Sequence, residues 1–422
     1  MSIENVLREV IEEWFAYDLP KVIPRDIPYS LPEGLALALV GPRRAGKTYF
    51  MYWITQDLMG KGWPRSSILY INFEDIRLSV LKPTDFSVFL KVVNEEAREY
   101  NGKILLLLDE IQNLPEWGRW VRTLLDKGRY LVVLSGSSSK LRADEVATEL
   151  RGRYIDRLIL PFSFKEFLRV RGFGQRFLNV PERHGKLLSH LRDYVFNGSL
   201  PEVVLRPEMA GDLIRTYRQT IIYRDIIERY RIRDVAFFET FLEVIEDNFG
   251  NYVSVTKLSN YFKSLGISKS KKTLNNYLKY LEESYYVVLI RKFGFSSREV
   301  LQQPRKVYPI DTAYFRRKSI GPMMESAVAI ELMRRGLSYN YLKVNDYEVD
   351  FVVHQEPREY IQVTYASARD EIDKREFRAL IKASEVLGRG IARIISWDLE
   401  DETTIEGLKV KITPLWKWLL MG

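Results

Sequence analysis

One eight-residue stretch constrains the fold of this chain more than any other feature. Residues 41–48 read GPRRAGKT and fit the pattern GxxxxGK[ST] without a mismatch. The apolar run from Leu35 to Val40 precedes it and predicts a buried strand, and a helix is expected from Tyr49 to Met59. A strand, a glycine-containing loop and a helix in this order are typical of a phosphate-binding loop in an α/β fold. An ordinary surface turn is the alternative.

The loop predicts a nucleoside triphosphate ligand. Glycine in such a loop lets backbone N–H groups face the phosphates, and the N-terminus of the following helix adds partial positive charge. Lys47 is expected to reach the β- and γ-phosphates, and the Thr48 hydroxyl to ligate Mg²⁺. The expected cofactors are therefore ATP and Mg²⁺, bound by Gly41, Pro42, Arg43, Arg44, Ala45, Gly46, Lys47, Thr48 and Tyr49.

A second apolar run ends in two acidic residues that suit hydrolysis. Residues 104–108 read ILLLL and predict a strand buried on both faces, followed by Asp109 and Glu110. We expect Asp109 to hold Mg²⁺ beside Thr48, and Glu110 to polarise the attacking water as general base. A solvated turn is the alternative for such a pair.

The next segments offer sensors and a charge-neutralising arginine. A strand is predicted from Tyr130 to Leu134, and at its end Ser135 and Ser137 are candidates to sense the γ-phosphate. A serine- and glycine-rich loop is the plainer reading. Further along, Arg151 or Arg153 could neutralise charge in the transition state, or both could simply be solvated.

Taken in order, these motifs resemble a known family. GPRRAGKT, LLLLDEIQ followed by Trp117, SGSSS, RGR and LPFSFKEF are similar to the AAA-type P-loop ATPases of archaea and bacteria that carry a winged helix and a restriction-endonuclease-like fold behind the motor. The resemblance covers essentially the whole chain. It implies an ASCE-type parallel sheet with the catalytic glutamate directly after the Walker B aspartate.

Composition limits the remaining classes. A chain of 422 residues is expected to form two to four domains, and no apolar run approaches the roughly 18 residues of a membrane span. The absence of cysteine excludes disulfides and thiolate sites and favours a cytoplasmic protein, and the charged composition fits a thermophile. A net charge of +8 permits contact with a polyanion. The first 19 residues predict an amphipathic helix capped by Ser2, with Val6, Val10, Trp14 and Phe15 on one face.

Four parts are expected along the chain. Residues 1–160 would form the P-loop ATPase core with its N-terminal helix, and 161–233 a helical lid and linker. Residues 234–306 would form a winged helix-turn-helix, and 307–422 a mixed α/β domain of the restriction-endonuclease-like kind.

The third part predicts a nucleic-acid contact. Helices are expected at 237–248, 254–265 and 269–284, with Tyr261 on the inward face of the second and Ser268 as the N-cap of the third, before a strand at 285–292. The third helix would expose side chains that suit phosphates and base edges, and docking to a protein is the alternative. These residues are Lys269, Lys271, Lys272, Asn275, Asn276 and Lys279.

The last part predicts a degenerate nuclease site. The resemblance implies that active relatives hold Mg²⁺ with a helical Glu, a strand Asp and a Glu-x-Lys. Glu325 and Asp350 match the first two, but Gln362 and Thr364 stand where the second carboxylate and the lysine belong. The two carboxylates are thus expected to lack a basic partner, and no cleavage is expected.

These features favour an ATP-hydrolysing AAA-type ATPase that acts on DNA or is regulated by it. The alternative is an ATP-dependent regulatory or signalling switch that binds protein partners, and an ATP-dependent nuclease is a third reading. The expected partners are ATP or ADP, DNA through the winged helix, a protein partner or a second copy of the chain, and no membrane.

Overall fold

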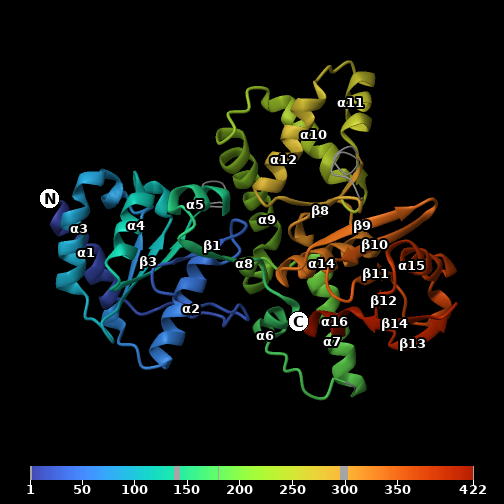
Figure 1. Ribbon diagram of the computed structural model, residues 1–422, viewed down its shortest axis with the longest axis horizontal. Coiled ribbons are helices and arrows are strands. Elements are labelled where there is room, and N and C mark those ends of the chain that lie inside the picture. Colours follow the sequence, from blue (N-terminus) through green and yellow to red (C-terminus); the bar gives the residue numbers. More distant parts are fainter. Residues whose placement is uncertain (1, 137–142, 179, 295–302, 422) are drawn as a thin grey trace. The chain divides into compact units, whose positions relative to one another are not determined.

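The computed structural model describes residues 2–136, 143–178, 180–294 and 303–421. The chain divides into two compact units, Met1–Pro161 and Phe162–Gly422, which are described separately (Figure 1). The first unit ends within a residue of the expected end of the ATPase core. The expected lid, the expected winged helix and the last domain all fall within the second unit.

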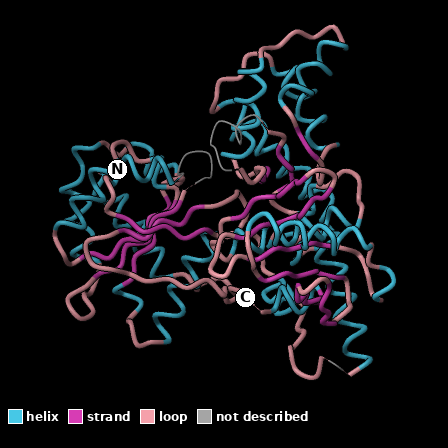
Figure 2. Tube along the Cα trace, turned by 45° about the vertical axis from the view of Figure 1, so that its right-hand side comes forward, coloured by secondary structure: helices cyan, strands magenta, loops and turns pink. Residues whose placement is uncertain are grey.

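A parallel five-stranded sheet forms the centre of the first unit, with strand order β2-β3-β4-β1-β5. Figure 2 shows its strands in magenta with helices in cyan on both sides. Every residue of β1, β3 and β4 is buried, as their apolar runs predict. Because all strands are parallel, the ends of β1, β4 and β3 meet at one edge of the sheet. The strands are β1 (Ala36–Val40), β2 (Ile68–Asn72), β3 (Ile104–Asp109), β4 (Tyr130–Ser135) and β5 (Tyr154–Leu158).

Helices cover both faces of this sheet. Apolar residues of α2 pack on one face together with Leu37, Leu105 and Val133, and those of α1, α3 and α4 pack on the other. The five helices are α1 (Ile3–Ala16), α2 (Lys47–Gly60), α3 (Phe86–Glu96), α4 (Trp117–Asp126) and α5 (Ala143–Leu150), with 3₁₀ turns η1 (Arg65–Ser67), η2 (Ile76–Val80), η3 (Pro83–Asp85) and η4 (Ile111–Asn113).

Helix α1 begins where the sequence predicts and covers the edge strand β2. The Ser2 side chain accepts a hydrogen bond from the Asn5 N–H at 3.2 Å, which caps the helix. The helix ends at Ala16, earlier than expected, and the indole N–H of Trp14 donates to the Ile68 carbonyl of β2 at 2.7 Å.

The second unit opens with helices that share the core of the C-terminal sheet. Helix α7 packs against α14, and α6 against α16. Asp311, 112 residues further on, accepts hydrogen bonds from both the N–H and the hydroxyl of Ser199 at 2.9 Å. The expected lid is therefore built into this unit. Its elements are α6 (Phe164–Val170), α7 (Pro181–Asn197), α8 (Pro201–Leu205), η5 (Pro207–Met209), α9 (Ala210–Thr220) and the π-helix η6 (Ile221–Glu228).

Three helices and a small antiparallel sheet follow, with strand order β6-β8-β7. The third helix begins later than expected, because the Ser270 side chain, rather than that of Ser268, caps it by accepting from the Thr273 N–H at 3.0 Å. Tyr261 is 48% exposed, so its expected inward position is wrong. The elements are α10 (Val235–Asp247), β6 (Tyr252–Val253), α11 (Val255–Ser264), α12 (Lys271–Glu283), β7 (Val287–Ile290) and β8 (Arg305–Pro309).

A mixed six-stranded sheet completes the unit, with strand order β13-β14-β12-β11-β10-β9. Its elements are η7 (Thr312–Tyr314), α14 (Ile320–Arg334), β9 (Tyr339–Val344), β10 (Tyr347–Val353), β11 (Glu359–Val363), η8 (Arg369–Glu371), α15 (Lys374–Leu387), β12 (Ile391–Ser396), β13 (Asp401–Ile405), β14 (Leu408–Pro414) and α16 (Leu415–Leu420).

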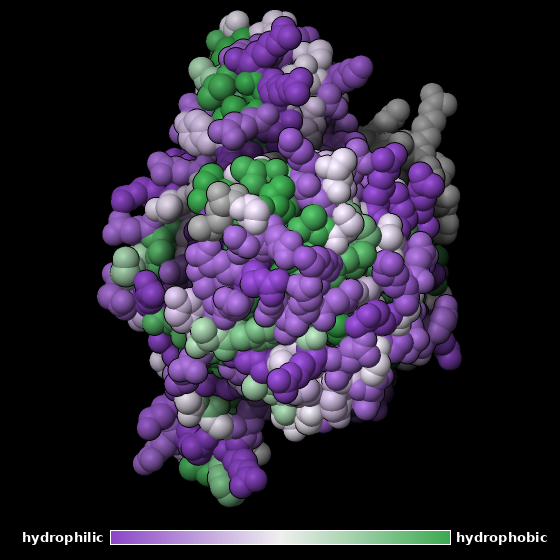
Figure 3. Space-filling model, turned by 90° about the vertical axis from the view of Figure 1, so that its left-hand side faces the viewer, coloured by the Kyte–Doolittle hydropathy of each residue, from purple (hydrophilic) through white to green (hydrophobic). Residues whose placement is uncertain are grey.

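One face of the molecule is mostly polar. On the face drawn in Figure 3 hydrophilic residues predominate, and hydrophobic ones form scattered patches. Among the described residues, no helix combines the length and the apolar character that crossing a membrane requires.

Candidate functional site

The loop between β1 and α2 needs glycine at two positions. Gly41 has a φ of +139°, and a Cβ there would lie 2.2 Å from the Ile159 carbonyl oxygen, just after β5. Gly46, the residue before α2, has a φ of +94°, which side chains rarely adopt. The conformation of the loop is thus fixed by packing against the neighbouring strand as well as by its own turn.

Lys47 and Thr48 begin α2, and their side chains contact the loop and Asp109. The buried Lys47 ammonium donates to the carbonyl oxygens of Gly41 and Pro42, at 3.0 and 2.9 Å, so it lies across the loop. The Thr48 hydroxyl donates to the Asp109 carboxylate at 2.7 Å. A residue of the loop and a residue at the end of β3, 61 positions apart, are thereby brought together.

Asp109 is the centre of a set of hydrogen bonds. Its Oδ2 accepts from the Thr48 hydroxyl at 2.7 Å and from the Tyr70 hydroxyl at 2.8 Å. Its Oδ1 accepts from the Ser135 hydroxyl, and from the Glu110 N–H at 3.1 Å. The side chains of three residues predicted for this site, Thr48, Asp109 and Ser135, therefore meet where the strands end. Ser137 lies outside the described residues.

Glu110 has an unusual backbone conformation. Its φ is +49°, in the left-handed region, and the Gln112 side-chain amide donates to its carboxylate. A non-glycine residue in this region costs on the order of 1 to 3 kcal/mol, and such strain clusters at functional sites. The conformation turns the chain sharply at the end of β3, immediately after Asp109.

The residues at this edge fit a magnesium ion. The Thr48 hydroxyl oxygen and Asp109 Oδ2 are 2.7 Å apart, close enough to serve one ion. Mg²⁺ is usually held by one or two such oxygens together with waters and substrate phosphates, rather than by an all-protein cage. Accordingly, in the part of the chain that the structure describes, no three His, Cys, Asp or Glu side chains form a metal site.

Arg25 also contacts the loop, although no local sequence motif identifies it. Its buried guanidinium donates to the Ala45 carbonyl at 3.0 Å and to the Leu160 carbonyl at 2.7 Å. It thereby joins the loop to the chain after β5. Of the other loop residues, Arg44 and Tyr49 are exposed and Arg43 is partly exposed, so all three can meet a ligand.

The arginines proposed as transition-state groups lie at the other end of the sheet. Arg151 is exposed, and Arg153 forms an ion pair with Asp126 at 2.6 Å. Both precede β5, which pairs in parallel with β1, and the loop follows the far end of β1. A strand of this length spans roughly 13 Å, more than an arginine side chain covers. Neither arginine therefore reaches the loop of its own chain.

The residues predicted to contact nucleic acid are divided by the structure. Lys269 precedes α12 and pairs with Asp234 at 2.6 Å. The other five lie on α12, and Asn275 accepts from Arg305 at 3.2 Å. The exposed members are Lys271, Lys272, Asn275 and Lys279, whereas Asn276 is partly buried.

A second cluster of ionisable groups surrounds the expected nuclease residues. The buried Lys306 ammonium, from β8, lies 2.8 Å from Asp350, 3.3 Å from Glu325 and 2.6 Å from Glu348. The expectation that these carboxylates lack a basic partner is therefore wrong. The lysine comes from a strand distant in the sequence and not from position 364.

Electrostatics in this cluster follow from burial and from charge. Burial opposes the charge of Lys306, but the neighbouring carboxylates outweigh it and raise the pKa of the ammonium. Burial, aided by Asp350, raises the pKa of Glu325 to about 7. Glu376 on α15 has a pKa raised to about 7 by burial and by Asp350 and Asp373.

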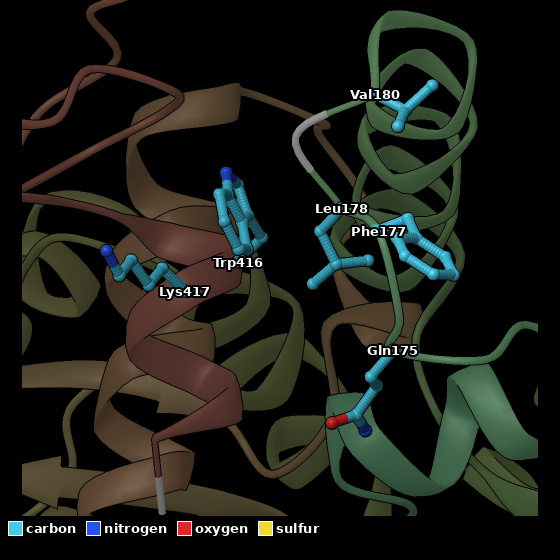
Figure 4. Close-up of a pocket in the computed structure, with 6 residues that line it drawn as sticks. All are labelled: Gln175, Phe177, Leu178, Val180, Trp416 and Lys417. Carbon is cyan, nitrogen blue, oxygen red and sulfur yellow. The ribbon is translucent and has the colours of Figure 1, made fainter.

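The remaining nuclease positions have structural contacts. The Gln362 side chain accepts from the Asp350 N–H and donates to the Glu348 carbonyl, both at 2.8 Å. The Thr364 N–H pairs with the Ile395 carbonyl at 2.9 Å. Elsewhere in this unit a pocket is lined mainly by apolar side chains (Figure 4), and none of the described residues that line it is a carboxylate or a histidine. Its lining residues are Gln175, Phe177, Leu178, Val180, Trp416 and Lys417.

Comparisons with known proteins identify the first unit. A family model described as an AAA domain matches residues 33–168. These residues span the five-stranded sheet, its loop and the acidic pair, and they form a P-loop AAA-type domain. A second model, described as a domain of unknown function (DUF8612), matches residues 188–318.

Two relatives extend this similarity along the chain. The uncharacterized protein MJ1544 of Methanocaldococcus jannaschii is 32% identical over 416 residues, which cover 95% of this chain and 91% of the relative. An uncharacterized protein of Haemophilus influenzae is 30% identical over 334 residues, which cover 77% of this chain and 81% of the relative.

Solved structures overlap only in part. The Walker-type ATPase of Pyrococcus abyssi has 12% identity and a TM-score of 0.37, covering 73% of this chain and 93% of that one. The ORC1 protein of Aeropyrum pernix, solved in complex with DNA, has 13% identity and a TM-score of 0.29, with 79% and 93% covered. At these TM-scores neither structure bears on what this chain does.

Proposed function

The chain belongs to the same family as these relatives from Methanocaldococcus jannaschii and Haemophilus influenzae, and we propose that its first unit binds ATP with Mg²⁺ and hydrolyses it. The observation that carries this proposal is the meeting of Thr48, Asp109 and Ser135 at the sheet edge, with Glu110 next in the chain. A site that only bound nucleotide would not need an acidic pair at this position.

Each side chain has a defined task in the proposed reaction. Lys47 and the N–H groups of the loop bind the phosphates, while Thr48 and Asp109 hold Mg²⁺. Bound there, Mg²⁺ would neutralise charge on the β- and γ-phosphate oxygens. Glu110 accepts the proton of the attacking water, which attacks the γ-phosphorus while the bond to the β-γ bridging oxygen breaks. The products are ADP and inorganic phosphate.

Two substitutions test this assignment. Lys47→Ala should abolish tight ATP binding, because it removes the loop's ammonium. Glu110→Gln should keep ATP binding but lower kcat by about 100-fold or more, because an amide does not accept the water's proton. Binding is measured by calorimetry and turnover by phosphate release. Wild-type turnover in Glu110→Gln would show that another group is the base.

For the second unit we propose a winged helix that contacts DNA. Three helices and a small antiparallel sheet, with β6 between the first two helices and β7 and β8 after the third, are the elements of that fold, and α12 would be its recognition helix. The exposed lysines 271, 272 and 279 on this helix suit phosphate contacts. ATP hydrolysis would then be coupled to DNA binding. An increase in the ATPase rate on addition of duplex or single-stranded DNA would support this coupling.

Docking of a protein partner on the same three-helix segment is the alternative function. Tyr261 and Leu265, on and just after α11, are about half exposed and offer apolar contact area. Under this alternative the protein is a regulatory switch whose ATPase rate DNA does not change.

We also propose that the six-stranded domain has a nuclease-like fold that does not cut DNA. Gln362 and Thr364 supply neither a carboxylate nor a cation, and the Lys306 ammonium pairs with both Asp350 and Glu348 and offsets part of their negative charge. No cleavage of linear, circular or single-stranded DNA is expected with Mg²⁺ or Mn²⁺. Cleavage that is lost in Asp350→Ala but kept in Lys47→Ala would contradict this.

A further inference from the structure

Tyr70 reaches the proposed magnesium site from a strand that carries none of the nucleotide-binding motifs. It lies on the edge strand β2, and its hydroxyl donates to Asp109 Oδ2 at 2.8 Å, 39 residues away in the sequence. The Thr48 hydroxyl donates to the same oxygen at 2.7 Å. Two hydroxyl groups, from α2 and from β2, thus donate to one carboxylate oxygen.

The Tyr70 ring is held in place by other aromatic rings. Its centroid lies 5.2 Å from that of Trp14 on α1 and 5.1 Å from that of Tyr52 on α2. Because neighbours on two helices contain the ring, the hydroxyl cannot swing away from the carboxylate without repacking. A tyrosine hydroxyl is protonated at neutral pH, so it can donate to the carboxylate.

We propose that Tyr70 is a positioning residue that orients Asp109 for the Mg²⁺ of bound Mg-ATP. This inference rests on the proposed function of the first unit. A hydroxyl bound to a carboxylate forms a charge-assisted hydrogen bond, one of the stronger kinds in proteins. A carboxylate oxygen has two lone pairs, so Oδ2 can accept from Tyr70 and still serve a cation. Thr48, by contrast, must turn its proton away from Oδ2 to offer its own oxygen to the same ion.

A second tyrosine in the same sheet, the buried Tyr130, provides a control. Tyr130 is the first residue of β4, at the opposite end of the strands from Asp109. Its hydroxyl donates to the Asn94 side-chain oxygen at 2.6 Å. Replacement of either tyrosine by phenylalanine removes one hydroxyl and one hydrogen bond. Only Tyr70→Phe alters the surroundings of Asp109.

The test is the affinity of the full chain for a non-hydrolysable ATP analogue, measured by calorimetry with excess Mg²⁺ and with EDTA. In wild type, Mg²⁺ should tighten binding. In Tyr70→Phe the affinity in EDTA should be unchanged, and the gain from Mg²⁺ should fall about tenfold, as expected for loss of one hydrogen bond to a charged group. Tyr130→Phe should keep the full gain. In an Asp109→Asn background, Tyr70→Phe should have no further effect.

The outcomes separate this inference from the function on which it rests. A wild-type gain that Tyr70→Phe retains, or an equal loss of affinity in Mg²⁺ and in EDTA, would overturn the positioning role alone. Absence of any wild-type gain would contradict the proposed magnesium site and, with it, the role of Tyr70. Thermal unfolding of both variants checks that each remains folded. If Tm falls equally in the two, Tyr130→Phe serves as the reference for the effect of losing one tyrosine hydroxyl.

Discussion

At the scale of single residues, both clusters place charge where burial makes it costly. Asp109 is surrounded by hydroxyl and N–H donors. The carboxylates around Lys306 share one ammonium, and Glu325 and Asp350 also accept from the Tyr308 hydroxyl and the Val363 N–H. The cluster around Asp109 suits the proposed magnesium site. In the other cluster the Lys306 ammonium already occupies the position of a cation.

Glu376 should make the stability of the second unit depend on pH. Its pKa is raised from 4.5 to about 7, so the protonated form stabilises the fold fully below about pH 4.5, and this contribution is lost as the pH rises through about 7. Glu376→Gln keeps the side chain neutral. It should raise the free energy of unfolding by on the order of 2 to 3 kcal/mol at pH 8, and change it little at pH 4.5.

Urea denaturation at the two pH values measures this difference. Glu385→Gln is the control, because Glu385 lies on the same helix, is exposed and pairs with Lys382 at 2.7 Å. An equal gain for Glu376→Gln at both pH values would show that ionisation is not the cause.

At the scale of elements, what the sequence predicts well is what neighbouring residues determine. The buried strands, the loop and the cap of α1 follow from apolar runs, glycine spacing and Ser2. Tyr70 and Lys306 could not be predicted in this way, because their partners Asp109 and Asp350 lie 39 and 44 residues away. Their roles arise only when separate strands pack together.

The same limit explains the errors in the helical segments. Two serines, at 268 and 270, precede α12, and either could cap it by residue type. The expected lid has a predictable turn at residues 197–199, but nothing local indicates that Asp311 accepts from this turn.

Helix α12 provides the element-scale test of DNA binding. Replacement of lysines 271, 272 and 279 by Gln should weaken DNA binding and reduce the slope of log K against log salt by up to about 2.7, because fewer counterions are released. The control replaces lysines 382, 409 and 417, which changes the net charge equally. Fluorescence anisotropy across a salt series measures both. Unchanged affinity in the α12 variant would favour protein docking.

At the scale of the whole molecule, the position of Arg151 would make its use in catalysis depend on the assembly of two copies of the chain. It lies a strand length from the loop of its own chain, so a role in phosphoryl transfer would require a second copy. Arg151→Ala should then lower kcat far more than nucleotide affinity. Mixing this variant with Lys47→Ala should restore part of the activity, because one copy keeps the arginine and the other keeps the loop.

Mass measurement and phosphate release test this together. Arg119→Ala is the control, because Arg119 is exposed and pairs with its helix neighbour Glu116 at 2.5 Å. A monomeric mass at micromolar concentration, with no rescue on mixing, would leave Arg151 with a structural role.

The covering of β2 by α1 has a consequence for the behaviour of the protein in solution. An uncovered edge strand presents free N–H and C=O groups to which another chain can add a strand, and natural proteins often protect such edges with a helix. Here Trp14 takes the Ile68 carbonyl, and Arg65 stacks on the Trp14 ring at 4.6 Å while donating to the Tyr17 carbonyl at 2.7 Å. Helix α1 therefore prevents another chain from pairing with the edge strand β2. A chain without α1 should aggregate through β2 even when its nucleotide site is intact.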